Sequence, residues 1–185
     1  MTVTPTALPD VLRVERRVFQ DDRGWFVEAW SAERYRQAGI AEAFVQDNAS
    51  FSEHGVLRGL HLQRAPHAQG KLVSVLQGEV FDVAVDVRPD SPTFGEWVGE
   101  TLSAENGVQL YIPPGFAHGF VVTSEAALFT YKCTDVYAPA CEASVRWDDP
   151  DIGIAWPVAS PAVSPKDAAA PSLQELKEGT PAVAS

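Results

Sequence analysis

The chain has 185 residues, of which 45% are hydrophobic and 21% charged, and its 14 basic and 25 acidic residues give a formal charge of −11. This apolar fraction excludes wholesale disorder and allows a single domain with a sizeable core. Nucleic acid is excluded as a partner by the lack of Lys/Arg clusters, and no apolar run approaches the roughly 18 residues that cross a bilayer.

The N-terminus has neither the basic start nor the apolar stretch of a signal peptide. Two cysteines, Cys133 and Cys141, are too few for a disulfide scaffold. We therefore expect a cytoplasmic protein with two reduced thiols and no membrane partner.

Short runs with strand-like alternation follow one another along the chain. In chain order, strands are expected over 11–19 and 25–30, followed by a helix over 31–38 that starts on Ser31 as its N-cap and stops at Gly39. Further strands are expected over 56–62, 71–77, 79–87, 96–102, 108–112, 118–122 and 126–133, and a second helix over 171–178 begins at Pro171. Many short strands without alternating helices indicate an all-β antiparallel sandwich or barrel. We expect one domain over 1–178 and a flexible tail over 179–185, which has nothing to bury.

The strand expected over 79–87 has the clearest pattern. Its apolar residues occupy every second position and alternate with Asp82 and Asp86. Period two with one apolar side is typical of a half-buried strand.

Two stretches resemble the paired motifs of the cupin family. Segment 107–122 contains G-x5-P-x-G-x2-H, ending at His118, and lacks only the final Asn of the motif, because Val122 stands there. Segment 55–63 opens with G-x5-H, ending at His61, like the first motif. The resemblance implies a double-stranded β-helix, or jelly-roll barrel.

The first motif then departs from its usual metal ligands. A metal-binding cupin has a cage of three His and one Glu, and here the equivalent positions are His61, Gln63, Lys71 and His118. Gln is a poor ligand for a transition metal, and an ammonium group repels a cation. We expect no metal and no cofactor, and a fixed positive charge that suits an anionic ligand or an enolate.

Longer stretches resemble the dTDP-4-dehydrorhamnose 3,5-epimerase family over roughly residues 8–171. The matching segments are 19–30, 45–50, 56–63, 69–73, 80–88, 91–97, 113–120, 130–132, 147–150, 156–157 and 164–171. The combination of VLRGLH, SPTFG and PPGFAHGF is far more specific than any single motif. The resemblance implies a dTDP-sugar substrate and a homodimer in which N-terminal strands extend the partner's sheet.

The family reaction defines which groups the chain must supply. Its substrate, dTDP-4-dehydro-6-deoxy-D-glucose, has a ketone at C4, so C3 and C5 both lie next to a carbonyl. The resemblance implies that His61 is the base, paired with Asp167, and that Tyr131 is the acid on the opposite side. Lys71 would offset the charge that develops on the C4 oxygen.

Each of these residues also has a structural interpretation. Tyr131 could belong to a cross-strand aromatic pair, and Asp167 could be solvated in an Ala/Pro-rich segment. His118 could hold the barrel together through a buried hydrogen bond. A single His on a strand is more often structural than catalytic, and a lone Lys is usually on the surface.

A diphosphate that approaches a protein of charge −11 needs local cations. Family-matched segments contain the candidate substrate-binding residues Arg23, Glu28, Gln46, Asp47, Asn48, Arg58, His118 and Lys166. The resemblance adds Glu142, which matches a position that lines the family pocket, and Tyr137 is an accessory candidate because it has the same parity as Tyr131. Arginine can hold a phosphate with two hydrogen bonds. Arg58 and His61 differ in parity along one strand, and we expect Gly59 to mark a bulge that turns both inward.

Alternatives to a 3,5-epimerase remain open from the sequence. One is a related 5-epimerase, 3-epimerase or ketoisomerase that acts on a dTDP-4-keto-6-deoxy sugar. The others are a metal-dependent cupin oxygenase, disfavoured by Gln63 and Lys71, and a sugar-binding cupin without catalysis.

Overall fold

Strands make up most of the regular structure of residues 1–179, the part of the chain that the computed structural model describes. One sheet has the order β1-β2-β10-β7-β12-β5 and the other the order β13-β6-β11-β8-β9. The first comprises β1 (Thr2–Pro5), β2 (Leu12–Glu15), β10 (Val108–Ile112), β7 (Lys71–Gln77), β12 (Ala126–Cys133) and β5 (Gln46–Glu53). The second comprises β13 (Glu142–Ser144), β6 (Leu57–Gln63), β11 (Phe116–Val122), β8 (Glu79–Asp86) and β9 (Trp97–Ser103).

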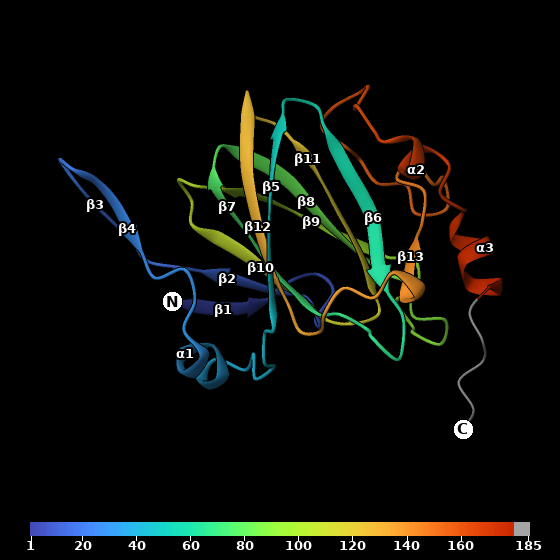
Figure 1. Cartoon of the computed structure of the whole chain (residues 1–185), viewed down its shortest axis with the longest axis horizontal. Coiled ribbons are helices and arrows are strands. Elements are labelled where there is room, and N and C mark those ends of the chain that lie inside the picture. The colour runs from blue at the N-terminus through green and yellow to red at the C-terminus, as the bar shows by residue number, and fades with distance from the viewer. Residues whose placement is uncertain (180–185) are drawn as a thin grey trace.

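The two sheets face each other, and strands far apart in sequence lie side by side within each of them (Figure 1). This arrangement confirms the all-β jelly-roll prediction. A separate hairpin of β3 (Val18–Asp21) and β4 (Gly24–Val27) projects from the body of the molecule. None of the helices in residues 1–179 is long and apolar enough to span a membrane.

The prediction that 79–87 forms a half-buried strand is wrong, because both faces of β8 are buried. Val80 and Ala84 pack between the sheets, while Val83 and Val85 pack in a second cluster on the other face. That cluster includes Ile152, Leu173 and Leu176 from the C-terminal part of the chain. Asp82 and Asp86, on the same side as Val80, are both fully buried. The polar side of the alternating pattern therefore faces the protein interior.

Some predicted boundaries shift, for local reasons. The strand expected over 11–19 is divided into β2 and β3 by buried Arg16, whose Nε donates to the Gly107 carbonyl at 2.9 Å. The strand expected over 25–30 ends at Val27, with β4. Strands β1, β5 and β13 were not predicted, since short or polar segments such as QDNASFSE in β5 have weak strand propensity.

The helices are short. The expected helix over 31–38 is α1 (Ala32–Gln37), and a 3₁₀ turn, η1, spans Pro139–Cys141. The helix expected to begin at Pro171 is α3 (Leu173–Glu178), which begins later because Ser172 caps it in a capping box with Glu175. An unpredicted helix, α2 (Pro165–Ala168), is capped by Ser164. Of the tail expected over 179–185, residues 180–185 lie outside the described part of the chain.

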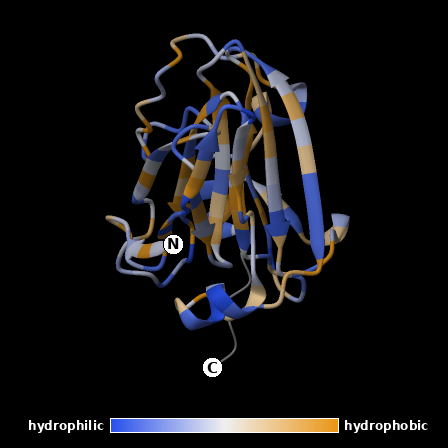
Figure 2. Cartoon of the chain, turned by 90° about the vertical axis from the view of Figure 1, so that its left-hand side faces the viewer, coloured by the Kyte–Doolittle hydropathy of each residue, from blue (hydrophilic) through white to orange (hydrophobic). Residues whose placement is uncertain are grey.

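Helix α1 covers part of the outer face of the six-stranded sheet. Tyr35 and Ile40 pack there against Val14, Leu72 and Tyr111. The rest of α1 is hydrophilic, whereas hydrophobic and hydrophilic residues alternate along the strands (Figure 2). This contrast is the one expected of a surface helix on an amphipathic sheet.

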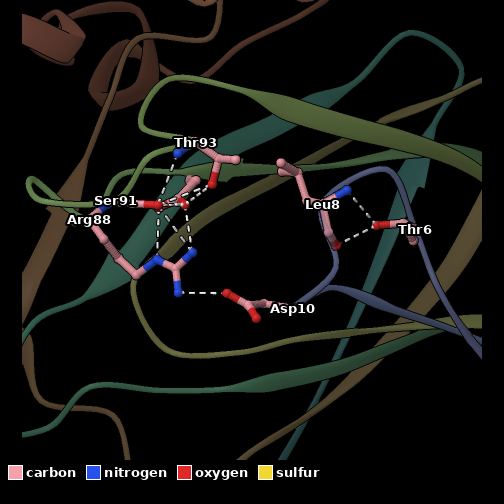
Figure 3. A network of polar contacts seen from close by, with 7 residues as sticks. Thr6, Leu8, Asp10, Arg88, Ser91 and Thr93 are labelled. Carbon is pink, nitrogen blue, oxygen red and sulfur yellow. Dashed lines mark hydrogen bonds and ion pairs between the residues drawn. The ribbon is translucent and has the colours of Figure 1, made fainter.

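A polar network holds the segment after β8 against the N-terminal part of the chain (Figure 3). The Arg88 guanidinium donates to Asp86 at 2.6 Å and to Asp10 at 2.8 Å. The hydroxyls of Ser91 and Thr93 donate to the same Asp86 oxygen at 2.6 and 2.7 Å. Burial raises the pKa of Asp86, but the hydrogen bonds from Arg88, Ser91 and Thr93 outweigh it and lower the pKa to about 2.

Candidate active site

A cavity of about 510 Å³ lies between the two sheets and is lined by seven of the fourteen predicted site residues, including all four catalytic candidates. Its walls come from β5, β6, β7, β11, β12 and the segment that leads into α2. The polar and aromatic residues that line it are Ser50, Arg58, His61, Lys71, His118, Phe120, Phe129, Tyr131, Ser164, Lys166 and Asp167.

A bulge in β6 brings Arg58 and His61 to the same cavity. In the pairing with β11, His61 lies opposite His118 and Arg58 opposite Phe120, so β6 contains one extra residue. Gly59 in the bulge has φ +141°, and a Cβ there would lie 2.6 Å from the Gly119 Cα. Only glycine fits, and the prediction of a bulge at Gly59 is confirmed.

His61 is paired with a buried carboxylate. Its Nε2 lies 2.7 Å from Asp167 Oδ1, and the backbone N–H of Gly59 donates to Oδ2 at 3.4 Å. Asp167 is held in place by α2, where its N–H donates to the Ser164 hydroxyl at 3.1 Å. A carboxylate only accepts hydrogen bonds, so it fixes the proton on Nε2 and leaves Nδ1 with a lone pair. The side chain of His61 is 32% exposed and that of Asp167 only 4%. This arrangement suits a general base.

Lys71 and His118 form a buried cluster next to this pair. Lys71 Nζ donates to the His61 carbonyl at 3.2 Å, and His118 Nε2 lies 2.8 Å from Asp82 Oδ2. Burial lowers the pKa of Lys71 and of His118 and raises the pKa of Asp82. The cluster thus places one basic side chain where an anion formed in the cavity would be stabilised.

Asp82 was not predicted as a site residue. Its only sequence signal was its place on the polar side of the alternating 79–87 pattern. That position gave no indication of burial or of the bond to His118.

Tyr131 lies on the opposite wall from His61, since it belongs to β12 of the six-stranded sheet and His61 to β6 of the other. Its ring packs 6.0 Å from that of Phe129, and Lys71 Nζ lies 6.0 Å from its centroid. Burial raises the pKa of Tyr131, more than nearby Arg58 lowers it. The phenol therefore stays protonated at neutral pH and can act as a proton donor.

A second group of predicted residues is connected by hydrogen bonds next to the cavity. Lys166 Nζ donates to Glu142 at 2.7 Å, and the Tyr137 hydroxyl donates to the same carboxylate at 3.2 Å. The backbone N–H of Tyr137 donates to Gln46 Oε1 at 2.8 Å, and Gln46 in turn donates to Asn48 at 3.1 Å. Because Lys166 lines the cavity and adjoins Asp167, this group lies beside the catalytic candidates.

Three further predicted residues neither line the cavity nor belong to this hydrogen-bonded group. Asp47 alternates with Gln46 and Asn48 on β5 and pairs with Lys132 at 2.8 Å. Arg23, whose side chain is 89% exposed, lies at the turn of the β3–β4 hairpin and bonds to Asp21, while Glu28 follows β4 and lies 3.4 Å from Arg34. Their binding roles remain predictions.

Three of the four metal-ligand positions of the cupin motif lie at the cavity, but one of the three is a lysine and the fourth position points elsewhere. His61, Lys71 and His118 line it, but Gln63 does not. Within residues 1–179, no three His, Cys, Asp or Glu side chains come together as metal ligands would. Cys133 and Cys141 are both free thiols.

Comparisons with known proteins agree with this geometry. Residues 5–175 match the family model described as dTDP-4-dehydrorhamnose 3,5-epimerase. A curated enzyme of that name from Salmonella typhimurium is 56% identical over 177 residues, covering 95% of this chain and 97% of the relative.

Solved structures show the same similarity. That of dTDP-6-deoxy-D-glucose-3,5-epimerase from Legionella pneumophila, in complex with dTDP-4-keto-L-rhamnose, has 52% identity and a TM-score of 0.89, covering 94% of this chain and 93% of the other. A 3'-monoepimerase from Streptomyces bikiniensis, in complex with dTDP-quinovose, has 36% identity and a TM-score of 0.87, covering 92% and 87%.

Proposed function

The chain belongs to the dTDP-4-dehydrorhamnose 3,5-epimerase family, and we propose that it inverts both C3 and C5 of dTDP-4-dehydro-6-deoxy-D-glucose by proton transfer between His61 and Tyr131. The product would be dTDP-4-dehydro-L-rhamnose, the precursor of dTDP-L-rhamnose. The observation that carries the proposal is the position of the two residues on opposite walls of one cavity. Inversion requires this arrangement, because a proton leaves one face of a carbon and another arrives on the opposite face.

Each inversion has two steps. His61 Nδ1 removes the proton from the carbon next to the C4 ketone, and the electron pair of the C–H bond moves onto the C4 oxygen to give an enolate. Lys71 stabilises the oxygen anion, and Asp167 stabilises the imidazolium that forms. The enolate collapses as Tyr131 donates its proton to the opposite face of the carbon. Solvent then returns a proton to Tyr131 and removes one from His61.

The nucleotide would lie between the catalytic residues and the group around Tyr137. Arg58 and Lys166 supply cations for the diphosphate at the cavity wall. Gln46 and Asn48 supply amide groups for the base or sugar, and Tyr137 supplies an aromatic face. His118 lines the same cavity as Arg58 and Lys166, and Glu142 accepts hydrogen bonds from Lys166 and Tyr137.

Arg23 and Glu28 would contact substrate only in a homodimer. Their hairpin projects from the chain and exposes Phe19 by 50% and Phe26 by 69%, which is unusual for a surface without a partner. We propose that the hairpin of each copy reaches the cavity of the other. Sedimentation velocity would measure the oligomeric state, and a monomer at micromolar concentration would contradict this part of the proposal.

The reaction is tested by incubating the protein with dTDP-4-dehydro-6-deoxy-D-glucose in deuterated water and following C3 and C5 by NMR. We expect deuterium at both carbons and inversion of both. The similarity to a 3'-monoepimerase favours a second candidate, inversion at C3 alone, which the same spectra would reveal. Absence of exchange at both carbons would contradict both functions.

A further inference from the structure

Gln63, at a position where metal-binding cupins have a ligand, has a fully bonded side chain. It is the last residue of β6 and is 4% exposed. Its Nε2 donates to the carbonyls of His67 at 2.8 Å and Val136 at 3.1 Å, and its Oε1 accepts from the backbone N–H of Ala138 at 2.8 Å. These bonds use both N–H groups and the oxygen of the amide. Gln63 therefore joins the β6–β7 connection to the segment 136–138.

The segment that Gln63 holds contains Tyr137, whose side chain is among the exposed large hydrophobic groups, at 55%. Gln63 bonds to the residues on both sides of it, Val136 and Ala138. The backbone N–H of Tyr137 itself donates to Gln46, and its hydroxyl donates to Glu142. Glu142 is also the residue directly opposite Gln63 in the pairing of β13 with β6. The backbone on both sides of this exposed ring is thus held by the buried Gln63 side chain, and the hydroxyl of the ring is held by its hydrogen bond to Glu142.

We propose that Gln63 is a positioning residue that holds segment 136–138 so that Tyr137 presents its ring to the nucleotide before substrate arrives. The inference rests on the proposed function, in which Tyr137 contacts the nucleotide. A ring held in its binding orientation loses less conformational entropy on binding than a mobile one. Gln63 then acts on binding, since its side-chain hydrogen bonds go to His67, Val136 and Ala138 and not to His61, Tyr131 or Asp167.

Two substitutions separate the bonds of Gln63. Gln63→Met keeps the approximate volume and removes all three hydrogen bonds. Gln63→Glu keeps the acceptor for the Ala138 N–H but places an oxygen opposite the carbonyls of His67 and Val136, which breaks those two hydrogen bonds. This variant replaces Gln63→Met in the measurements if the Met variant fails to fold. The control is Gln37→Met, the same substitution at an exposed glutamine of α1 whose amide bonds to Glu33.

Three measurements test the inference: hydrogen exchange of the Tyr137 and Ala138 amides in the protein without ligand, the Kd for dTDP, and kcat with KM for the sugar nucleotide. For Gln63→Met we expect exchange of these amides at least about 10-fold faster, Kd and KM raised about 5- to 20-fold, and kcat within 2-fold of the parent. Gln37→Met should match the parent in all three. In the Tyr137→Ala background, Gln63→Met should raise Kd by less than 2-fold, because the group through which it acts is gone.

The outcomes are distinct. Unchanged exchange, or faster exchange with unchanged Kd, would overturn the inference, as would a full effect of Gln63→Met in the Tyr137→Ala background. A fall in kcat at constant KM would also overturn it and indicate a role in the chemistry. A parent protein that binds no dTDP would overturn the proposed function and with it the role of Gln63 in binding, while the exchange rates would still show whether Gln63 holds the segment.

Discussion

Asp167→Asn tests how the buried carboxylate acts on His61, because it removes the charge and keeps the side-chain volume. Asp167 accepts from His61 Nε2 at 2.7 Å and from the Gly59 N–H at 3.4 Å. An amide has a single oxygen for these two donors. If that oxygen stays with Gly59, the NH₂ group faces Nε2 and moves the ring proton to Nδ1, the nitrogen that accepts the substrate proton in the mechanism we propose. If it stays with His61, the tautomer is kept and only the charge is lost.

The loss of charge sets the minimum effect. Two unit charges 4 Å apart attract by about 1 kcal/mol in water and by about 4 kcal/mol at an effective dielectric constant of 20. The side chain of Asp167 is 4% exposed and that of His61 32%, so an intermediate value applies. A loss of roughly 3 kcal/mol in the stabilisation of the imidazolium corresponds to about a 10²-fold lower kcat.

The assay compares kcat and KM for epimerisation in the parent and the variant. We expect kcat to fall about 10²-fold and KM to change by less than about 3-fold, because Asp167 faces His61 rather than the nucleotide. Asp149→Asn is the matched control, since Asp149 is 2% exposed and accepts from the Leu173 N–H at 2.9 Å, outside the cavity. It should lower Tm and leave kcat unchanged. An Asp167→Asn variant with kcat within 2-fold of the parent would refute the assigned role of the carboxylate.

Four further predictions follow from the site and the fold. Tyr131→Phe removes the acid and keeps the ring, so C3 or C5 should still exchange with deuterium while NMR detects little inverted sugar; loss of exchange as well would contradict its role as the acid alone. Dialysis against a chelator should leave kcat unchanged, and activity that depends on one transition metal per chain would contradict the metal-free mechanism. Gly59→Ala should destabilise the protein by about 3 kcal/mol, or roughly 6–12 °C in Tm, since the added Cβ would overlap the β11 backbone at a positive φ. The control Gly153→Ala, at a positive φ without such a clash, should lower stability by only about 1 kcal/mol. Equal losses in the two variants would disprove the steric argument. The pKa of Asp86 is lowered to about 2, so the stability that its carboxylate contributes is complete above pH 4 and is lost as the pH falls toward 2. The difference in urea-unfolding free energy between the parent and Asp86→Asn should therefore shrink by about 2 kcal/mol over that range. A constant difference would contradict this assignment.

The sequence by itself determined the fold class and the family. Alternation of apolar residues with period two is a property of a single strand, so segments such as 71–77, 108–112 and 126–133 could be recognised without knowing their neighbours. The cupin spacings and the longer family segments likewise depend only on order along the chain. Helix α3 was predicted for the same reason. Only its start was wrong, because the capping box of Ser172 and Glu175 places the first helical residue at Leu173 rather than at Pro171.

The tertiary structure decided which face of each strand is inside and which groups meet. Asp82 looked like a solvent-facing residue of a half-buried strand, but the C-terminal segment covers the other face of β8, and His118 on β11 bonds to the carboxylate. Alternation along one strand cannot reveal this, because it describes two faces without saying what packs on either. In the same way, Gln63 bonds to a segment more than 70 positions away. Contacts of this kind form only when distant strands pair, so no local pattern in the sequence contains them.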